Sequence, residues 1–284
     1  MYICIKLIKD MVKRIFHCAD IHIRNVKRHE EYRVQLNRFI ESIKENTADC
    51  EFNEMRVVVA GDIFHQKIQT SNEQTILLSK FLKQLSEICP VILIAGNHDY
   101  LESNKDRIDS ITPIIESLEL PHVKYLDLEL DFKSGIYHED NIAWCLYSIF
   151  DGFKKPDIEA MRVDHPNKKF IGLFHGALTG SKTDTGFEFE HGVSLDIFEG
   201  CDVVMCGDIH KRQELNLGDI LVVYPGSLIQ QDRGESVSKH GYLIWDIENM
   251  DYEEVDLESD YGFYKFRINS IEELEEGIEE FVNF

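Results

Sequence analysis

The chain has 284 residues, of which 43% are hydrophobic and 29% are charged, as in ordinary soluble globular proteins. This length suits one large domain, or one domain with a small appendage. The formal net charge of -22 argues against a DNA-binding protein that relies on a basic surface, and against binding to an anionic membrane. A phosphate substrate stays open, because bound divalent cations can reverse the field of an acidic site.

The seven cysteines are scattered, form no CxxC pair and mostly lie within apolar runs, which indicates reduced core thiols and argues against a zinc–thiolate site. The sequence contains neither a membrane-spanning run nor a cleaved secretory signal, so we expect a cytoplasmic protein with no membrane partner, in the host cell if it is phage-encoded. We interpret residues 1–10 as an N-terminal extension before a second plausible start at Met11. A short extra edge strand is the alternative.

Strand and helix patterns alternate through the first half of the chain, the order typical of parallel or mixed sheets with crossover helices. We predict amphipathic helices over 31–46 and 72–88. A further helix is predicted over 108–118, and Pro113 places a boundary or kink inside it. The predicted strands are 13–18, 56–60, 91–95, 123–126, 141–147, 169–174, 202–206, 220–224 and 241–247, the last of which we expect to end this sheet system.

Two other segments are distinguished by their composition. Residues 178–191 carry few helix or strand signals and form a predicted loop, of the kind that often carries substrate contacts. Residues 249–260 form an acidic run typical of a linker, followed by a predicted strand over 261–269 and a predicted acidic helix over 271–281. The segment after 247 is too small to bury its own core, so it packs on the main domain or begins a second one.

Polar side chains follow five of the predicted strands, each at the point where the strand ends. In the most informative stretch, ILIAGNHDY, an apolar run stops at Gly96, which permits a tight turn and a close backbone approach. Because loops at one edge of a sheet converge, we expect the polar residues to form one site. They are Asp20 and His22, Asp62, Asn97 and His98, His175, and Asp208 and His210.

This set of side chains suits a dinuclear metal centre. Mixed imidazole and carboxylate ligands favour manganese, iron or zinc, and a shared carboxylate can hold two ions close together. A D-x-H spacing on extended backbone projects both side chains the same way, as at Asp20 and His22. A polar strand terminus is the alternative for any single motif, and the agreement of all five argues against it.

The motifs resemble those of the calcineurin-like metallophosphoesterases, in which DxH, GD, GNHD, a lone strand-end His and GxH occur in this order. Within that superfamily GDIFH, GNHD and the PGS of YPGSLIQQDRGE are most similar to SbcD-type DNA repair and recombination nucleases, particularly their phage relatives. The resemblance implies an α/β fold, a four-layer α-β-β-α sandwich over 11–247, with a short, incomplete C-terminal cap over 248–284. It also implies a metal-dependent phosphodiesterase that acts as exonuclease or endonuclease on DNA ends.

The same resemblance implies that two divalent ions are bound, with Asp62 bridging them. We expect Mn²⁺, with Mg²⁺, Fe²⁺ or Zn²⁺ as alternatives. One ion would be held by Asp20, His22, Asp62 and His210, and the other by Asp62, Asn97, His175 and Asp208.

Three further residues receive catalytic roles from the resemblance. His98 would be a non-ligand that protonates the leaving 3' oxygen or stabilises charge on the phosphorus. Asp99 would orient His98 by a hydrogen bond, and His65 would lie near the DNA phosphate. Ser227 is interpreted as a turn residue and not as a nucleophile. Lys211 and Arg212 are interpreted as phosphate contacts or as solvated surface.

The sequence departs from the family pattern at two places. Asp208 stands where most relatives have His, which moves metal selectivity towards manganese or magnesium and away from zinc. An SbcC-type ATPase partner and a homodimer are implied, but the helical segment that grips the ATPase in relatives is not matched, which argues against binding through it. A phosphatase or cyclic-nucleotide phosphodiesterase, or a catalytically silent scaffold for an SbcC-type ATPase, stay open as alternatives.

Overall fold

The structure is a computed structural model that describes residues 11–264, except 48, 105 and 106. The predicted extension at 1–10 and the predicted helix over 271–281 lie outside the described residues. Residues 261–264, at the start of the predicted strand over 261–269, are irregular, and the rest of that strand also lies outside. None of the helices in the described ranges is long and apolar enough to cross a membrane.

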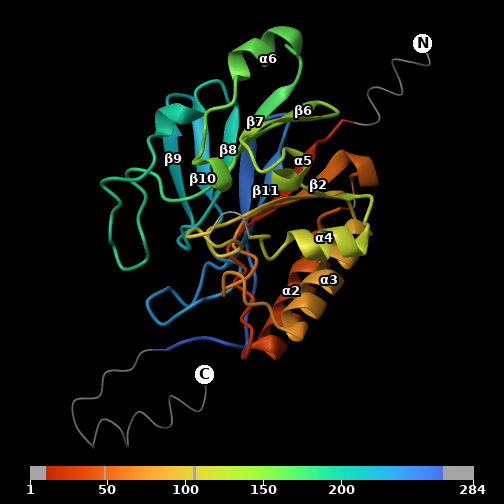
Figure 1. The fold of residues 1–284 in the computed structure, drawn as a ribbon, viewed down its shortest axis with the longest axis vertical. Coiled ribbons are helices and arrows are strands. Elements are labelled where there is room, and N and C mark those ends of the chain that lie inside the picture. The colour runs from red at the N-terminus through yellow and green to blue at the C-terminus, as the bar shows by residue number, and fades with distance from the viewer. Residues whose placement is uncertain (1–10, 48, 105–106, 265–284) are drawn as a thin grey trace, which may run out of the picture.

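Two six-stranded sheets form the centre of the molecule (Figure 1). In the first sheet the order is β12-β11-β1-β2-β3-β4, and β1 to β4 run parallel, whereas β11 is antiparallel to both of its neighbours. Its strands are β1 (Arg14–Cys18), β2 (Met55–Ala60), β3 (Val91–Ile94), β4 (Val123–Tyr125), β11 (Gly241–Asp246) and β12 (Asp251–Asp256).

The second sheet has the order β5-β6-β7-β8-β10-β9, with four parallel strands at its centre and an antiparallel strand at each edge. Its strands are β5 (Gly135–Glu139), β6 (Ile142–Tyr147), β7 (Lys169–His175), β8 (Val203–Gly207), β9 (Gln213–Leu217) and β10 (Ile220–Tyr224). The central strands of both sheets read as continuous apolar runs, as expected for strands that are covered on both faces.

The layers follow from the alternation of side chains along these strands. On β2, Val57 and Val59 belong to the core under the helices, whereas Val58 and Ala60 belong to the core between the two sheets. The helical layer on the first sheet consists of α2 (His29–Glu45), α3 (Asn72–Ser86) and α4 (Thr112–Leu118) (Figure 1). These features confirm the predicted α-β-β-α order.

The fourth layer is thin. The outer face of the second sheet packs against the short helix α6 (Ile158–Asp164), the single turn η3 (Leu195–Phe198) and apolar side chains of the loop after β7. The remaining short helices are η1 (Phe52–Glu54), α5 (Leu126–Glu129) and η2 (Ile149–Asp151).

The predicted helices and strands that lie in the described residues agree with the structure to within a few residues at their ends. Pro113 lies in the first turn of α4, so it marks a helix boundary and not a kink. The edge strands β5 and β9, which are half exposed and rich in polar residues, were not predicted. The expectation that 241–247 ends the sheet system is wrong, because β12 pairs with β11 from Gly241–Asp256 to Asp246–Asp251.

The strand β12 has the acidic composition from which a linker was predicted. Charged residues are common on exposed edge strands, where they prevent pairing with other chains. Here Arg212 compensates part of the charge, with Nη1 3.0 Å from Glu254 Oε2 and 2.7 Å from Asp256 Oδ1. Its side chain is 5% exposed, so Arg212 fastens this edge strand and does not face a substrate. The domain division at 247 stays a prediction.

Asp127, on α5, is hydrogen-bonded to the backbone directly after β3. Its carboxylate accepts hydrogen bonds from Ala95 N (2.8 Å) and Ser148 Oγ (2.6 Å), and burial raises its pKa to about 6. Since the folded-state pKa is raised, the stability that protonated Asp127 gives is full below the unfolded value of 3.8 and is lost as the pH rises through about 6.

We therefore expect Asp127→Asn to stabilise the fold at pH 7.5 by about 1–3 kcal/mol, since the amide can keep both contacts without a buried charge. At pH 4 the difference from wild type should be close to zero. Urea denaturation at both pH values measures this. A gain of equal size at both pH values would contradict the explanation by charge burial.

Candidate metal centre

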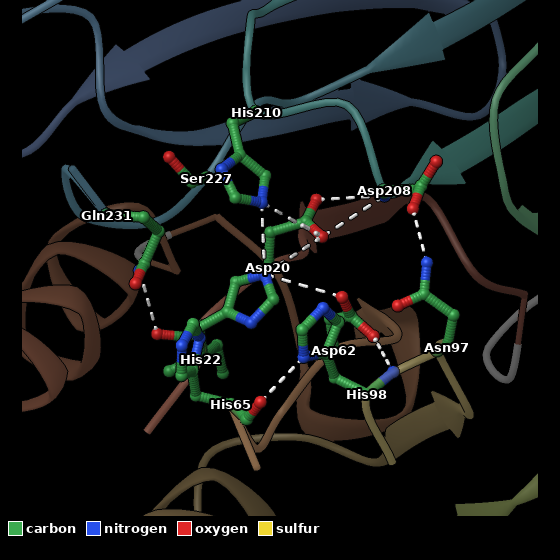
Figure 2. A network of polar contacts seen from close by, with 12 residues as sticks. Asp20, His22, Asp62, His65, Asn97, His98, Asp208, His210, Ser227 and Gln231 are labelled. Atoms are coloured by element: carbon green, nitrogen blue, oxygen red, sulfur yellow. Dashed lines mark hydrogen bonds and ion pairs between the residues drawn. The ribbon is translucent and has the colours of Figure 1, made fainter. Parts of the chain in front are cut away.

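All seven predicted ligands lie together at one edge of the two sheets, His175 as the last residue of β7 and the others in the segments that follow β1, β2, β3 and β8. Figure 2 shows six of them converging with His65 and His98. Backbone hydrogen bonds hold the loops after β1 and β2 side by side, from Asp20 N to the Gly61 carbonyl (3.1 Å) and from His22 N to the Asp62 carbonyl (2.9 Å). The expected convergence of strand ends is thus observed.

A first cluster of donor atoms surrounds His22. Its Nε2 atom lies 3.0 Å from His210 Nε2, 3.4 Å from Asp62 Oδ2 and 3.9 Å from Asp20 Oδ1. His210 Nε2 in turn lies 4.0 Å from Asp20 Oδ1. Asp20, His22 and His210 are one of the groups in the described residues whose ligand atoms are close enough together to hold one metal ion.

A second cluster surrounds His175. Its Nε2 atom lies 3.3 Å from Asp62 Oδ1 and 3.8 Å from Asp208 Oδ1, and the Asn97 amide contacts the same Asp208 oxygen at 2.8 Å. His175 Nδ1 donates to the Ala60 carbonyl (2.7 Å), which leaves the lone pair on Nε2. That Nε2 atom is buried and has no hydrogen-bond partner in the described residues, as expected of a metal ligand.

Asp62 joins the two clusters. Its Oδ2 atom faces His22 and its Oδ1 atom faces His175, while the side chain is 2% exposed. One carboxylate therefore offers one oxygen to each cluster, the geometry that a bridging ligand requires. Together with the unpartnered nitrogen of His175, this arrangement of imidazole and carboxylate groups fits a pair of divalent cations.

The buried carboxylates of the site also favour the binding of cations. Burial raises the pKa of Asp20 to about 7 and raises that of Asp208. Burial would also raise the pKa of Asp62, but the charges of His175 and His22 outweigh it and lower that pKa. Several carboxylates are thus buried close together at a cost that bound divalent cations would remove.

The backbone at the ligands is unusual, because φ is positive at Asp20 (53°), His22 (50°), Asp62 (52°) and Asp208 (94°). The premise that D-x-H side chains project from extended backbone is therefore wrong. Left-handed backbone at residues other than glycine costs up to about 1–3 kcal/mol each and is found mostly where the surrounding structure fixes it, as at functional sites. Here the hydrogen bonds between the loops after β1 and β2 fix it at Asp20, His22 and Asp62, and Asp208 N donates to the Asp20 carboxylate at 3.0 Å.

Gly96 fulfils the predicted role of a close backbone approach. A Cβ atom at this position would lie 2.1 Å from Asp62 Oδ1, 2.3 Å from Asp62 N and 2.7 Å from His175 Cε1. We therefore expect Gly96→Ala to displace the bridging carboxylate, to destabilise the fold by about 1–3 kcal/mol and to weaken metal binding.

Melting curves and metal analysis of the purified variant would measure both effects. Gly135→Ala is the matched control, because its Cβ atom would meet nothing closer than 3.6 Å. Two bound ions in the Gly96 variant, with unchanged melting, would contradict the packing argument.

The structure corrects the role predicted for Asp99. Its buried carboxylate accepts hydrogen bonds from the backbone N–H groups of Ile63 (3.3 Å), Phe64 (3.0 Å) and Gly96 (2.9 Å), and none joins it to His98 in the described residues. The prediction that Asp99 orients His98 by a hydrogen bond is wrong. Asp99 instead ties the loop after β2 to the loop after β3.

His98 is oriented by the backbone of His65. Its Nδ1 atom donates to the His65 carbonyl at 2.6 Å, since a carbonyl oxygen can only accept, and its own N–H donates to Asp62 Oδ1 at 2.8 Å. In a neutral ring the lone pair is therefore on Nε2.

His65 stacks on His98, with ring centroids 5.4 Å apart and planes inclined by 24°. Its Nε2 atom accepts from Arg24 Nη1 at 2.9 Å, and burial together with the Arg24 charge lowers its pKa to about 4. A permanent positive charge, that of Arg24, thus lies next to His65. The imidazoles of His22, His65 and His98 form a further group close enough together to hold an ion.

Two site residues, Arg24 and Glu235, were missed in the sequence. Neither stands at a strand end, and the only signal for Glu235 was its position in the segment YPGSLIQQDRGE. Glu235 Oε1 lies 2.6 Å from His210 Nδ1.

Ser227 is fully buried and hydrogen-bonded to Glu235 Oε2 (3.4 Å) and His240 Nδ1 (3.0 Å), which agrees with a turn role and not with a nucleophile.

A cavity of about 560 Å³ opens beside the second cluster. Its walls include Asn97, Asp208 and His210 from the clusters, and Phe189 and Lys211 from outside them. Phe189 belongs to the loop that the sequence singles out for substrate contacts. A group attached to a phosphate at the clusters would therefore meet this loop.

Residues 13–212 match the family described as calcineurin-like phosphoesterase. An uncharacterized protein of Acanthamoeba polyphaga mimivirus is 38% identical over 266 residues, which are 92% of this chain and 19% of that protein. The SbcD component of the nuclease SbcCD of Staphylococcus epidermidis is 25% identical over 261 residues, which are 83% of this chain and 66% of that protein. The chain thus spans less than two thirds of the length of these relatives.

Among solved structures, an archaeal phosphodiesterase is 14% identical, with a TM-score of 0.42, and the match covers 86% of this chain and 99% of that one.

Proposed function

The chain belongs to the calcineurin-like phosphoesterase family, and we propose that it is a manganese-dependent DNA nuclease that hydrolyses phosphodiester bonds at DNA ends. The observation that carries the proposal is the position of Asp62, which offers one buried carboxylate oxygen to each of two ligand clusters. Two divalent ions bound there supply charge stabilisation for a phosphate and a nucleophile from water at neutral pH.

The first ion would be held by Asp20, His22, Asp62 and His210, and the second by Asp62, Asn97, His175 and Asp208. A carboxylate in place of the usual imidazole at Asp208 favours manganese over zinc. His98 provides the acid, because its Nδ1 atom is anchored on the His65 carbonyl and its Nε2 atom remains available to the leaving oxygen. Arg24 adds a permanent positive charge next to this pair, on a chain that is otherwise strongly acidic.

Similarity to the SbcD component of a nuclease supports DNA as the substrate, as do the motifs GDIFH, GNHD and PGS. By the same similarity we propose an SbcC-type ATPase as partner, a homodimer, and a role in recombination and repair. The acidic surface makes binding to DNA dependent on the metal ions and on a few local cations, so we propose that DNA is held mainly at the site and not along a basic groove.

Release of nucleotides from linear duplex DNA with Mn²⁺, compared with hydrolysis of a small aryl phosphate diester, tests the proposal. We expect cleavage of DNA in the presence of Mn²⁺, and loss of this cleavage when a chelator removes the metal. Hydrolysis of the small substrate alone would favour a phosphatase or cyclic-nucleotide phosphodiesterase. Two bound ions with no hydrolysis of either substrate would favour a silent scaffold.

A further inference from the structure

We propose that Glu235 is a positioning residue, which holds the His210 imidazole so that its Nε2 atom faces the first ion. The proposal rests on the metal site of the proposed function but not on its substrate. Glu235 comes from the irregular segment between β10 and β11, whereas His210 follows β8, so a contact between them joins separate parts of the chain.

The direction of the hydrogen bond between Glu235 and His210 fixes the tautomer of the His210 imidazole. Glu235 Oε1 lies 2.6 Å from His210 Nδ1 and, as a carboxylate, can only accept. In the neutral ring the proton therefore resides on Nδ1, and the Nε2 lone pair points towards His22 Nε2 at 3.0 Å and Asp20 Oδ1 at 4.0 Å. A carboxylate that holds a histidine in this way raises its basicity and fixes its ring orientation as a metal ligand.

Glu235 is itself held firmly. Its Oε2 atom accepts from Gln231 N at 2.7 Å and from Ser227 Oγ at 3.4 Å, and its side chain is only 8% exposed. Gln230 Nε2 also donates to the Glu235 carbonyl at 3.1 Å. Both carboxylate oxygens thus have defined partners, so the position of the His210 ring is set by the segment from Ser227 to Glu235.

Binding of the second ion does not depend on Glu235 in this way. Its imidazole ligand, His175, is oriented by a backbone carbonyl, that of Ala60, at 2.7 Å. A change at Glu235 should therefore weaken one of the two ions selectively. A merely structural role, in which Glu235 stabilises its own segment, would affect neither ion or both.

Calorimetric titration of the full chain with Mn²⁺ would separate these roles. In Glu235→Gln one oxygen becomes an amide N–H₂ group, so either His210 or Gln231 N loses its acceptor. We expect the affinity of one ion to fall about 10–100-fold while that of the other is unchanged. Glu188→Gln is the matched control, because Glu188 is exposed and pairs with Lys182, and it should bind both ions as wild type does.

A second measurement avoids metal altogether. Nitrogen NMR of the metal-free protein at pH 10, above the His210 pKa of about 9, should show His210 with its proton on Nδ1, and Glu235→Gln should give a mixture of the two tautomers. Glu235→Asp, which keeps the acceptor at shorter reach, should recover part of the lost affinity. Equal binding of both ions by wild type and Glu235→Gln, with an unchanged tautomer, would overturn the proposal. A wild-type protein that binds two ions but does not cleave DNA would overturn only the substrate assignment.

Discussion

Replacing His98 by alanine should abolish DNA cleavage and leave the metal content of the protein unchanged. The hydrogen bond of this residue to the clusters is made by its backbone N–H, which donates to Asp62 Oδ1 and is retained in the variant, and the imidazole itself packs edge-on against His22. What is lost is an imidazole that is anchored through Nδ1 and can give a proton through Nε2. Loss of such an acid typically costs about 10²–10⁴-fold in rate.

The comparison needs Mn²⁺ saturation, single-turnover cleavage of duplex DNA and metal analysis of the same preparation. His138→Ala is a suitable control, because His138 lies on the exposed edge strand β5 and should leave both readings unchanged. Loss of an ion together with activity would assign His98 a ligand role, within the group that it forms with His22 and His65.

Asp62→Asn should have the largest effect on the metal centre. Each oxygen of Asp62 faces a different cluster, at 3.4 Å from His22 Nε2 and 3.3 Å from His175 Nε2. The amide has the same shape but offers only one oxygen and no charge, so we expect at most one ion to be bound and DNA cleavage to be lost.

Mn²⁺ titration of Asp62→Asn beside Asp127→Asn would measure this effect against another buried aspartate outside the clusters. The Asp127 variant should still bind two ions. Two tightly bound ions in the Asp62 variant would show that this residue does not bridge.

The residues of the site were predictable where they stand at the end of an apolar run in the sequence. Asp20, Asp62, Asn97, His175 and Asp208 each follow an apolar strand, and strand ends of a parallel sheet meet at one edge whatever the loops do. The backbone at Asp20, Asp62 and Asp208 was not predictable in the same way, because their left-handed conformations depend on hydrogen bonds to a neighbouring loop.

Roles that depend on partners far away in sequence were harder to read. Asp99 was paired with His98 because the two are adjacent, yet its carboxylate binds three backbone N–H groups. Glu235 meets His210 across 25 residues, with no spacing rule to connect them. The strand β12 escaped prediction because its two partly buried residues, Tyr252 and Val255, are three positions apart among acidic residues and so show no alternation.

Each ligand cluster draws on both sheets. Asp20, His22, Asp62 and Asn97 come from the first sheet, and His175, Asp208 and His210 from the second. An ion in either cluster would thus act as a crosslink between two layers that share an apolar core. Since such an ion binds the folded chain alone, the resistance of the whole fold to unfolding would rise with the logarithm of the free metal concentration.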